Sequence, residues 1–509
     1  MSKNKFTFLA ISITFAMSFI ISCSGKDGLD GKDYETAIPL CNGSSIYNPA
    51  TQACEIDFSK FTEEETKVLV RMRNPKSRVS VDEAVEQANW VIDFLNTGEL
   101  GVNRRINSVS ALASDDIEFA ESLKSIGIEV PDTLIYIVNF EDSLGFAIVS
   151  ADTRIDGSIL AFTGSGSLTD SIDNPGVSIF LEHLEDYMLN SIIEAERQKD
   201  SLIGGIMDKL TIETSTKSLV LPSDIFEIKE ISTVSSLVFP LVPIEWGQRV
   251  PFNDSLKYKN CPQNNGRVLT GCVAVAVAHI MSYWKHPAKI GNYSFDWTEL
   301  NKYTGNNKPP LYPGAAKTHI NNAPIPIRSQ VANLMKQIGN GVGMEYGCDL
   351  SVASKTSGPN FLLRNGFSLQ KTTPSLGSPT AVLASYNSKA AIASMNRREP
   401  LFVRGCSKKI NHKIFGFTIY TSYGECHAWV IDGYLKQRTV VTIGGLAISG
   451  YYDSEYIHNN WGWHGGSNGY FKSGVFNSNQ DPDIYISATK SGEDHNFQYE
   501  IQMTPYIRR

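Results

Sequence analysis

The sequence predicts an α+β fold divided into a smaller and a larger domain. At 509 residues the chain exceeds one ordinary domain, and its 42% hydrophobic content is enough to fill two cores. Residues 80–206 alternate amphipathic helical stretches with strand-like ones, whereas aromatic–glycine pairs, short strands and one strong apolar helix characterise residues 237–509. Between them, residues 207–236 are rich in Ser and Thr and lack a sustained period, which indicates an exposed connector open to proteolytic cleavage.

The amino terminus has the features of an export signal. Lys3 and Lys5 precede an unbroken apolar run from Phe6 to Ile21, which is slightly short for a membrane span. We therefore expect residues 1–22 to be a signal peptide.

Cys23 lies where such a signal would be cleaved. The sequence Ile20-Ile21-Ser22-Cys23 resembles a bacterial lipobox, in which the signal is cut before a cysteine that becomes lipidated, although small residues are commoner at the position of Ile21. Several acyl chains on one residue hold a protein stably at a membrane. We expect residues 23–79 to form a lipidated tether, with the protein at the outer membrane or cell surface. The alternative is an ordinary signal peptide, in which Cys23 has no such role.

The eight cysteines favour disulfides, because an exported chain meets an oxidising environment. Cys41 and Cys54 bracket a turn-rich loop and are expected to pair. Four others can pair in three ways, among which the sequence does not choose: Cys261, Cys348, Cys406 and Cys426.

Charge and motif content narrow the classes of function. The net charge of -7 is modest, and the sequence has no basic tract, which argues against nucleic acid as the main partner. It also has no CxxC pair and no HExxH helix. We therefore expect neither a metal site nor a cofactor.

Three segments account for the smaller domain. Ser80 and Glu83 form a capping box at the start of a helical apolar stripe. Residues 133–152 alternate in polarity around a turn that contains Gly145, which predicts two strands. Residues 177–198 carry apolar side chains at helical spacing, which predicts a second amphipathic helix.

The larger domain contains the stretch RVLTGCVAVAVAHIMSYWKHP, residues 267–287. Its alanines, its length and Pro287 beyond its end favour a buried helix over a strand, and Gly271 marks the start. Cys272 then lies in the first turn, where unpaired N–H groups and the positive end of the helix dipole favour a thiolate. Taken alone this signal is weak, because a cysteine in an apolar helix is commonly a buried hydrophobe.

A nucleophilic cysteine needs a base, and His427 in GECHAWVIDGY is the preferred candidate. As a strand, this segment places the imidazole on a sheet face, and a thiolate at a helix N-terminus opposite such an imidazole is a papain-like arrangement. His279 shares the helix with Cys272, but seven residues at 1.5 Å each put it about 10 Å away, too far for proton transfer. His458 and His464 are less favoured rivals.

Two further segments offer supporting groups. In YIHNNWGWHGGSNGYF, Asn459 or Asn460 is expected to orient the second imidazole nitrogen, with Trp461 shielding the contact from water. In IEWGQRVPFN, the Gln248 amide can join the Cys272 N–H as a donor to an oxyanion. The alternatives are a hairpin that serves only packing and a solvated glutamine at a strand end.

With these segments the larger domain resembles the streptopain family of papain-like cysteine peptidases. Five stretches carry the resemblance, in the family's order and over most of residues 240–475: WGQRVPFN, GCVAVAVAHIMSYWKHP, MEYGCDLSVAS, ECHAWVIDGY and NNWGWHGGSNGYF. The resemblance implies a two-lobed papain-like peptidase domain, with Cys272 as nucleophile, His427 as general base and acid, and Gln248 as oxyanion donor.

The resemblance also bears on the support of the histidine and on the smaller domain. It implies that Trp461 acts with a neighbouring asparagine, Asn460 by the pattern of this family and Asn459 by that of more distant papain relatives. SVDEAVEQANWVIDFLN, GFAIVSAD and ILAFTGSGSL resemble the family's inhibitory propeptide. Residues 80–206 are therefore expected to cover the cleft until the connector is cut.

Two residues depart from the family pattern. Cys426 stands where a glycine usually precedes the histidine, and His464 replaces a common glycine. A disulfide from Cys426, or a mixed one with Cys272, would be able to gate activity, and a side chain at His464 would narrow the cleft.

The sequence as a whole predicts a secreted or surface-anchored cysteine endopeptidase made as a zymogen. It would hydrolyse peptide bonds in proteins or peptides through a thiolate–imidazolium pair and an acyl-enzyme, with its own propeptide as intramolecular inhibitor. One alternative is a catalytically silent lipoprotein that acts as a protease inhibitor or binding module. Another is a transglutaminase or amidase with similar residues.

Overall fold

The structure of the protein is a computed structural model that describes residues 45–48, 53–56, 60–72, 77–98, 102–114, 117–169, 171–210, 228–306, 312, 315–372, 377–406, 413–415, 417–419, 426–443, 450–477 and 501–509. The predicted signal peptide, Cys23 and Cys41 lie outside these residues. Within them, no helix is both long enough and apolar enough to cross a membrane.

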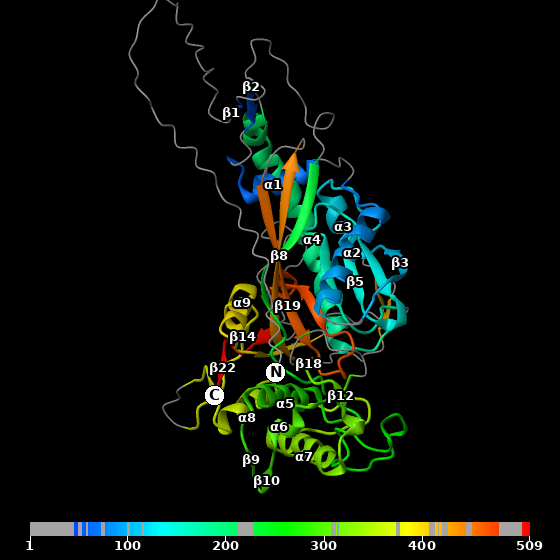
Figure 1. The fold of residues 1–509 in the computed structure, drawn as a ribbon, viewed down its shortest axis with the longest axis vertical. Coiled ribbons are helices and arrows are strands. Elements are labelled where there is room, and N and C mark those ends of the chain that lie inside the picture. The colour runs from blue at the N-terminus through cyan, green and yellow to red at the C-terminus, as the bar shows by residue number, and fades with distance from the viewer. Residues whose placement is uncertain are drawn as a thin grey trace, which may run out of the picture.

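A single antiparallel sheet runs through both predicted domains (Figure 1). Its strand order is β14-β21-β15-β18-β19-β20-β6-β5-β4-β3, and β8 pairs with β18 beside this path. The two domains join where β6 of the smaller domain pairs with β20 of the larger one, from Ala161↔Phe471 to Thr163↔Gly469. The strands of the joint sheet are β3 (Ile106–Leu112), β4 (Ile135–Phe140), β5 (Phe146–Ser150), β6 (Ile159–Thr163), β8 (Ile228–Val238), β14 (Ala384–Ser385), β15 (Leu401–Cys406), β18 (Cys426–Ile443), β19 (Gly450–Asn460), β20 (Gly469–Lys472) and β21 (Gln502–Met503).

The smaller domain forms as the sequence predicts. The Glu83 carboxylate accepts hydrogen bonds from the backbone N–H of Ser80 at 2.8 Å and from its hydroxyl at 2.9 Å, while Ser80 Oγ accepts the Glu83 N–H, so the capping box is present. The two strands predicted over residues 133–152 are β4 and β5. Its helices are α1 (Glu63–Met72), α2 (Val81–Gly98), α3 (Ile117–Ser125) and α4 (Pro175–Leu210), and its short strands are β1 (Ser45–Asn48), β2 (Ala53–Ile56) and β7 (Ser171–Ile172).

The larger domain has two lobes, which confirms the predicted architecture. One lobe is the continuation of the sheet, and the other gathers α5, α6, α7 and α8 at one end of the molecule (Figure 1). The strongly apolar α5 lies at the centre of the helical lobe's core and packs on the sheet residues Ala428 and Val430. The helices are α5 (Cys272–Trp284), α6 (Trp297–Leu300), α7 (Ile325–Val342), α8 (Ser357–Arg364) and α9 (Ser388–Asn396), and the short strands are β9 (Lys289–Ile290), β10 (Tyr293–Ser294), β11 (Tyr303–Thr304), β12 (Thr318–His319), β13 (Ser368–Leu369), β16 (Lys413–Ile414), β17 (Phe417–Ile419) and β22 (Ile507–Arg508).

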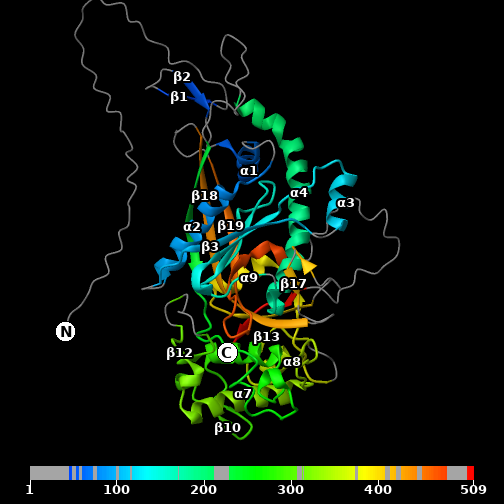
Figure 2. The same ribbon diagram turned by 90° about the vertical axis from the view of Figure 1, so that its right-hand side faces the viewer.

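The predicted connector and tether are shorter than expected. α4 continues to Leu210, running alongside the sheet (Figure 2), and β8 pairs with β18 over its whole length. Residues 207–210 and 228–236 are thus structured, and residues 211–227 lie outside the described part of the chain. α1, placed in the tether by the sequence, packs against α4 and β19. The mostly exposed side chains of β8 explain the error, since a solvated strand carries little hydrophobic alternation.

Two disulfides settle the open pairing of four cysteines. Cys261 pairs with Cys348, and Cys406 pairs with Cys426. Cys272 is a free thiol. The predicted partner of Cys54 is Cys41, which is not among the described residues.

Candidate active site

Cys272 is the first residue of α5, as the sequence predicts. Gly271 caps the helix with φ of +85°, a left-handed conformation that favours glycine. A Cβ at this position would also lie 2.6 Å from the sulfur of Met344. The chain therefore turns sharply into the helix at Gly271, and this turn sets the position of the thiol.

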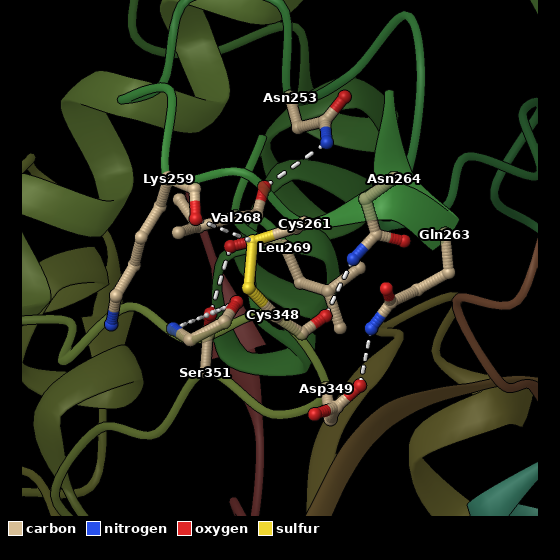
Figure 3. Close-up of a disulfide and its surroundings, with 11 residues drawn as sticks. Asn253, Lys259, Cys261, Gln263, Asn264, Val268, Leu269, Cys348, Asp349 and Ser351 are labelled. Atoms are coloured by element: carbon tan, nitrogen blue, oxygen red, sulfur yellow. Dashed lines mark hydrogen bonds between the residues drawn. A yellow bond between two sulfur atoms is a disulfide. The ribbon is translucent and has the colours of Figure 1, made fainter. Parts of the chain in front are cut away.

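The Cys261–Cys348 disulfide and the hydrogen bonds near it hold the segment that leads into α5 (Figure 3). The Ser351 hydroxyl donates to the carbonyl of Leu269 at 2.9 Å, and the Leu269 N–H donates to the carbonyl of Gly347 at 3.0 Å. The disulfide and these hydrogen bonds thus join the loop before α5 to the loop that contains Cys348. Together they fix the position of the helix start that carries Cys272.

Strand β18 brings His427 to the same place. His427 is the second residue of β18, where it pairs with Gly405 of β15. The backbone of the next residue, Ala428, lies close enough to the thiol of Cys272 to favour its thiolate form. The structure therefore places the predicted nucleophile beside the peptide group that follows the predicted base.

The His427 imidazole lies among three tryptophans. It stacks on Trp429 with ring centroids 6.1 Å apart and meets the edge of Trp463 at 6.4 Å. Its Nε2 is 2.8 Å from the backbone carbonyl oxygen of Trp461. A carbonyl only accepts, so this nitrogen carries the proton and Nδ1 is left as the basic atom in the neutral ring.

The expectation that an asparagine side chain orients His427 is wrong. The Asn459 oxygen accepts from the Trp429 indole at 2.8 Å, and the Asn460 amide donates to the carbonyl of Ile244 at 3.0 Å. Both side chains are committed elsewhere, and the main chain of Trp461 supplies the acceptor instead. Trp461 itself is fully buried against the indole of Trp429, as a shielding role requires.

The rival histidines are bound to other groups. Nε2 of His279 accepts the Trp246 N–H at 3.1 Å in the core. Nδ1 of His458 is 2.6 Å from an oxygen of Asp432, and both residues are buried. The ring of His464 packs on Gly247, next to Gln248, where a Cβ would lie 2.3 Å from it. His464 thus occupies the wall beside the predicted oxyanion donor.

Gln248 is held next to the start of α5. Its backbone carbonyl accepts the N–H of Thr270 at 3.1 Å, two residues before Cys272. The residue is buried, with 7% of its area exposed. The pairing places Gln248 and Cys272 on adjacent segments, which suits the role predicted for the glutamine.

Burial favours the neutral form of both members of the predicted pair in the full chain. Burial raises the pKa of the Cys272 thiol, against hydrogen bonds from the backbone at Ala428, Val273 and Cys272 itself. Burial lowers the pKa of His427 to about 4, against its hydrogen bond to the Trp461 carbonyl. The helix start alone predicted a thiolate, but here desolvation of both groups outweighs it.

The smaller domain packs directly on this aromatic wall. The first turn of α4 lies on the indole of Trp461, since a Cβ at Gly176 would be 2.1 Å from the ring. The Asn174 amide donates to the carbonyl of Gly466 at 2.9 Å, and the Ser165 hydroxyl donates to that of Gly465 at 2.7 Å. The loop that follows Trp461 is therefore clamped by the smaller domain.

The sequence analysis missed two residues at the site. Arg404 pairs with Ala428 across β15 and β18, and its positive charge favours the Cys272 thiolate. Asn468 accepts the Trp461 N–H. Asn468 lies within a motif that the sequence analysis singled out, but Arg404 lies in a strand without a motif.

Cys426 adjoins the predicted base, as the sequence requires, and its partner is Cys406 on the neighbouring strand. The considered mixed disulfide with Cys272 is absent from the described structure, because Cys272 is free. The Arg404 guanidinium donates to the sulfur of Cys406 at 3.2 Å.

Comparison with known proteins assigns the two domains separately. The model of the Peptidase C10 family matches residues 246–471, and the model described as Spi protease inhibitor matches residues 77–188. Streptopain of Streptococcus pyogenes serotype M28 is 23% identical over 383 residues, which cover 72% of this chain and 80% of that relative. Thiol protease/hemagglutinin PrtT of Porphyromonas gingivalis is 24% identical over 359 residues, which cover 69% of this chain and 35% of that relative.

Among solved structures, a fragment of Prevotella intermedia prointerpain A is 20% identical and aligns with a TM-score of 0.41, covering 74% of this chain and 96% of that one. The two family matches follow one another along the chain in the order predicted for propeptide and peptidase. The larger domain is therefore a peptidase domain of the Peptidase C10 family, the streptopain-like cysteine peptidases, and a Spi-type inhibitory prodomain lies in front of it.

Proposed function

We propose that Cys272 is the nucleophile of this peptidase and His427 its general base and acid. The observation that carries the proposal is the position of a free thiol at the first residue of α5, close to the backbone of the residue after His427. The Nε2 contact with the Trp461 carbonyl leaves Nδ1 as the proton acceptor.

In this mechanism His427 takes the thiol proton as Cys272 attacks a peptide carbonyl. The Cys272 N–H and the Gln248 amide stabilise the oxyanion of the tetrahedral intermediate. His427 then protonates the leaving amine, and an acyl-enzyme forms. Water, deprotonated by His427, hydrolyses this intermediate and restores the thiol. Proteins and peptides are the substrate class.

We infer that the prodomain keeps the pair neutral until the chain is cut between α4 and β8. Cleavage within residues 211–227 would separate the prodomain from β8 while leaving that strand in the peptidase sheet. The contacts of Gly176 and Asn174 with the Trp461 loop support this role. Their loss admits water, and solvation favours the charged forms of Cys272 and His427.

Substituting Cys272 by alanine in the chain from Ser24 onward abolishes self-processing, because no other described thiol is free. We expect the wild-type protein to lose its prodomain and to cleave casein, and the variant to stay intact. Gel electrophoresis at successive times measures the loss of the prodomain. Mass spectrometry after treatment with an epoxide thiol inhibitor measures the labelling of Cys272. A trace of wild-type enzyme should process the variant in trans, which shows that it is folded.

Other results would contradict the proposal. If both proteins mature equally without added enzyme, Cys272 is not the nucleophile of self-processing. If wild-type Cys272 does not react with the epoxide after processing, the silent binding module is favoured. Cross-linking of casein without cleavage would indicate a transglutaminase.

We further propose that the protein is exported and held at the outer membrane or cell surface through a lipidated Cys23. Support comes from the apolar run Phe6–Ile21 and the lipobox-like residues before Cys23. The Cys23→Ala variant should move from the membrane fraction to the soluble fraction, whereas the neighbouring Ser24→Ala variant should stay with the membrane. Fractionation and labelling with a fatty acid measure this, and equal partition of the two variants would contradict lipidation.

A further inference from the structure

The orientation of His427 depends on one main-chain carbonyl, and the structure shows what holds that carbonyl in place. Asn468 lies in the turn before β20 and is fully buried. Its Oδ1 accepts the N–H of Trp461 at 2.9 Å. Its Nδ2 donates to Oε1 of Glu245 at 3.0 Å and to Oδ1 of Asn460 at 3.1 Å. One amide therefore joins Trp461, which contacts the proposed base, to Glu245 and Asn460.

Through Asn460, the network also holds the peptide group between Trp461 and Gly462, whose carbonyl contacts His427. Oδ1 of Asn460 also accepts the N–H of Gly462 at 3.4 Å. The Gly462 N–H and the Trp461 carbonyl belong to one planar peptide group and point in opposite directions. Asn460 holds one side of this plane, and His427 contacts the other side. Asn468 thus restrains the two peptide groups that flank Trp461, one directly and one through Asn460.

Glu245 anchors the network from the opposite side. Its Oε2 accepts the Asn306 amide at 2.9 Å, and its backbone carbonyl accepts the N–H of Gly305 at 3.0 Å. The carboxylate is therefore fixed before it receives the Asn468 amide. A carboxylate accepts only, so it also sets which end of the Asn468 amide faces Trp461.

We propose that Asn468 is a positioning residue for His427, acting through the main chain of Trp461 and Gly462, with Glu245 fixing the amide of Asn468. This inference rests on the proposed role of His427. The network orients the acceptor of the imidazole N–H, whereas the sequence analysis expected a side-chain amide to orient the imidazole directly. It also gives Asn460 an indirect part in the same task.

The Asn468→Ala variant tests the proposal. The full chain is processed to completion, with a trace of affinity-tagged wild-type enzyme that is then removed, and active sites are counted with the epoxide inhibitor. We expect kcat on a peptide substrate to fall about 10- to 100-fold, with KM within about twofold, because a small displacement of a catalytic group costs on this scale.

The pH profile separates positioning from a structural role. The alkaline limb of kcat/KM reports loss of the imidazolium proton. A loosened acceptor at Nε2 stabilises the imidazolium cation less, so this limb should move to lower pH by about half a unit. Cys272 and Arg404, which interact with each other at the site, are unchanged in the variant, whereas the Glu245 carboxyl loses one hydrogen-bond donor. A matched control is Asn301→Ala, which removes an amide bound to Ser282 at the far end of α5 and should leave the pH profile unchanged.

Exchanging the amide and the carboxylate between Asn468 and Glu245 distinguishes loss of this hydrogen bond from a general loss of stability. Asn468→Asp retains an acceptor for Trp461 but sets a second carboxylate against Glu245, so kcat should fall as in the alanine variant. Combining it with Glu245→Gln restores a donor–acceptor pair with the roles reversed, and kcat should recover at least fivefold. If Asn468→Ala lowers only the melting temperature, or if the double variant is no better than Asn468→Asp alone, the proposal is overturned. Failure of the proposed function itself would differ, because the wild-type enzyme would then be inactive.

Discussion

Substituting His427 by alanine in the full chain lowers peptide hydrolysis by about 10⁴-fold, the scale on which residues that act as one catalytic unit operate. The effect is large because two of the rival histidines are bound to other groups. His279 accepts a backbone N–H in the core, and His458 is paired with Asp432. Self-processing should be lost as well, and kcat/KM after processing by added wild-type enzyme measures the remaining activity.

His286→Ala is the matched control for this substitution. His286 follows the C-terminal end of α5, and its ring is 2.8 Å from the carbonyl oxygen of Asn365, far along the helix from Cys272. We expect this variant to keep kcat/KM within about twofold of wild type. Equal activity of the His427 and His286 variants would remove His427 from the mechanism.

The sequence predicts the two elements that carry the pair because each has a local signal. α5 begins at Cys272 as the glycine and the apolar run indicate, and β18 follows the alternation around His427. The side chains needed for chemistry are visible as residue types at these places. The general architecture follows as well, since helical and strand periods reflect which face of an element is buried.

No local pattern in the sequence indicates which group accepts the hydrogen bond of the His427 imidazole. Every residue has a backbone carbonyl, so the choice of Trp461 over Asn459 or Asn460 depends on how the chain turns after β19. The role of Arg404 was not predicted for the same reason, since Arg404 acts on Cys272 only because β15 pairs with β18. Charge states also depend on packing, because burial is the largest influence on the pKa of both Cys272 and His427.

Domain boundaries were predicted least well, because the two domains share one sheet and one core. Trp461 of the peptidase and Ile179 of the prodomain belong to the same cluster of buried side chains. β8 is recognisable as a strand only through its pairing with β18. A boundary assigned from composition cannot capture such continuity, since composition reports segments one at a time.

The shared core predicts that Phe180→Ala weakens latency. Phe180 of α4 is fully buried and meets Phe471 of β20 edge-on, with centroids 4.8 Å apart, and Phe476 at 5.8 Å. Truncating a buried Phe costs about 3–5 kcal/mol, and part of this loss falls on the contact between prodomain and peptidase. At about 1.4 kcal/mol per factor of ten, we expect self-processing to accelerate about 10- to 100-fold.

The reactivity of the Cys272 thiol is a second measure of how far Phe180→Ala loosens the contact between prodomain and peptidase. In the closed chain the pKa of Cys272 is raised and that of His427 is lowered to about 4 by burial, so iodoacetamide should react slowly near pH 7. The Phe180→Ala chain should react faster before any cleavage is seen. Phe361→Ala is the matched control, since this buried Phe lies in the core of the helical lobe. It should lower the melting temperature without a comparable gain in alkylation. Equal acceleration by both variants would mean that general destabilisation, and not the contact of α4 with β20, controls access to Cys272.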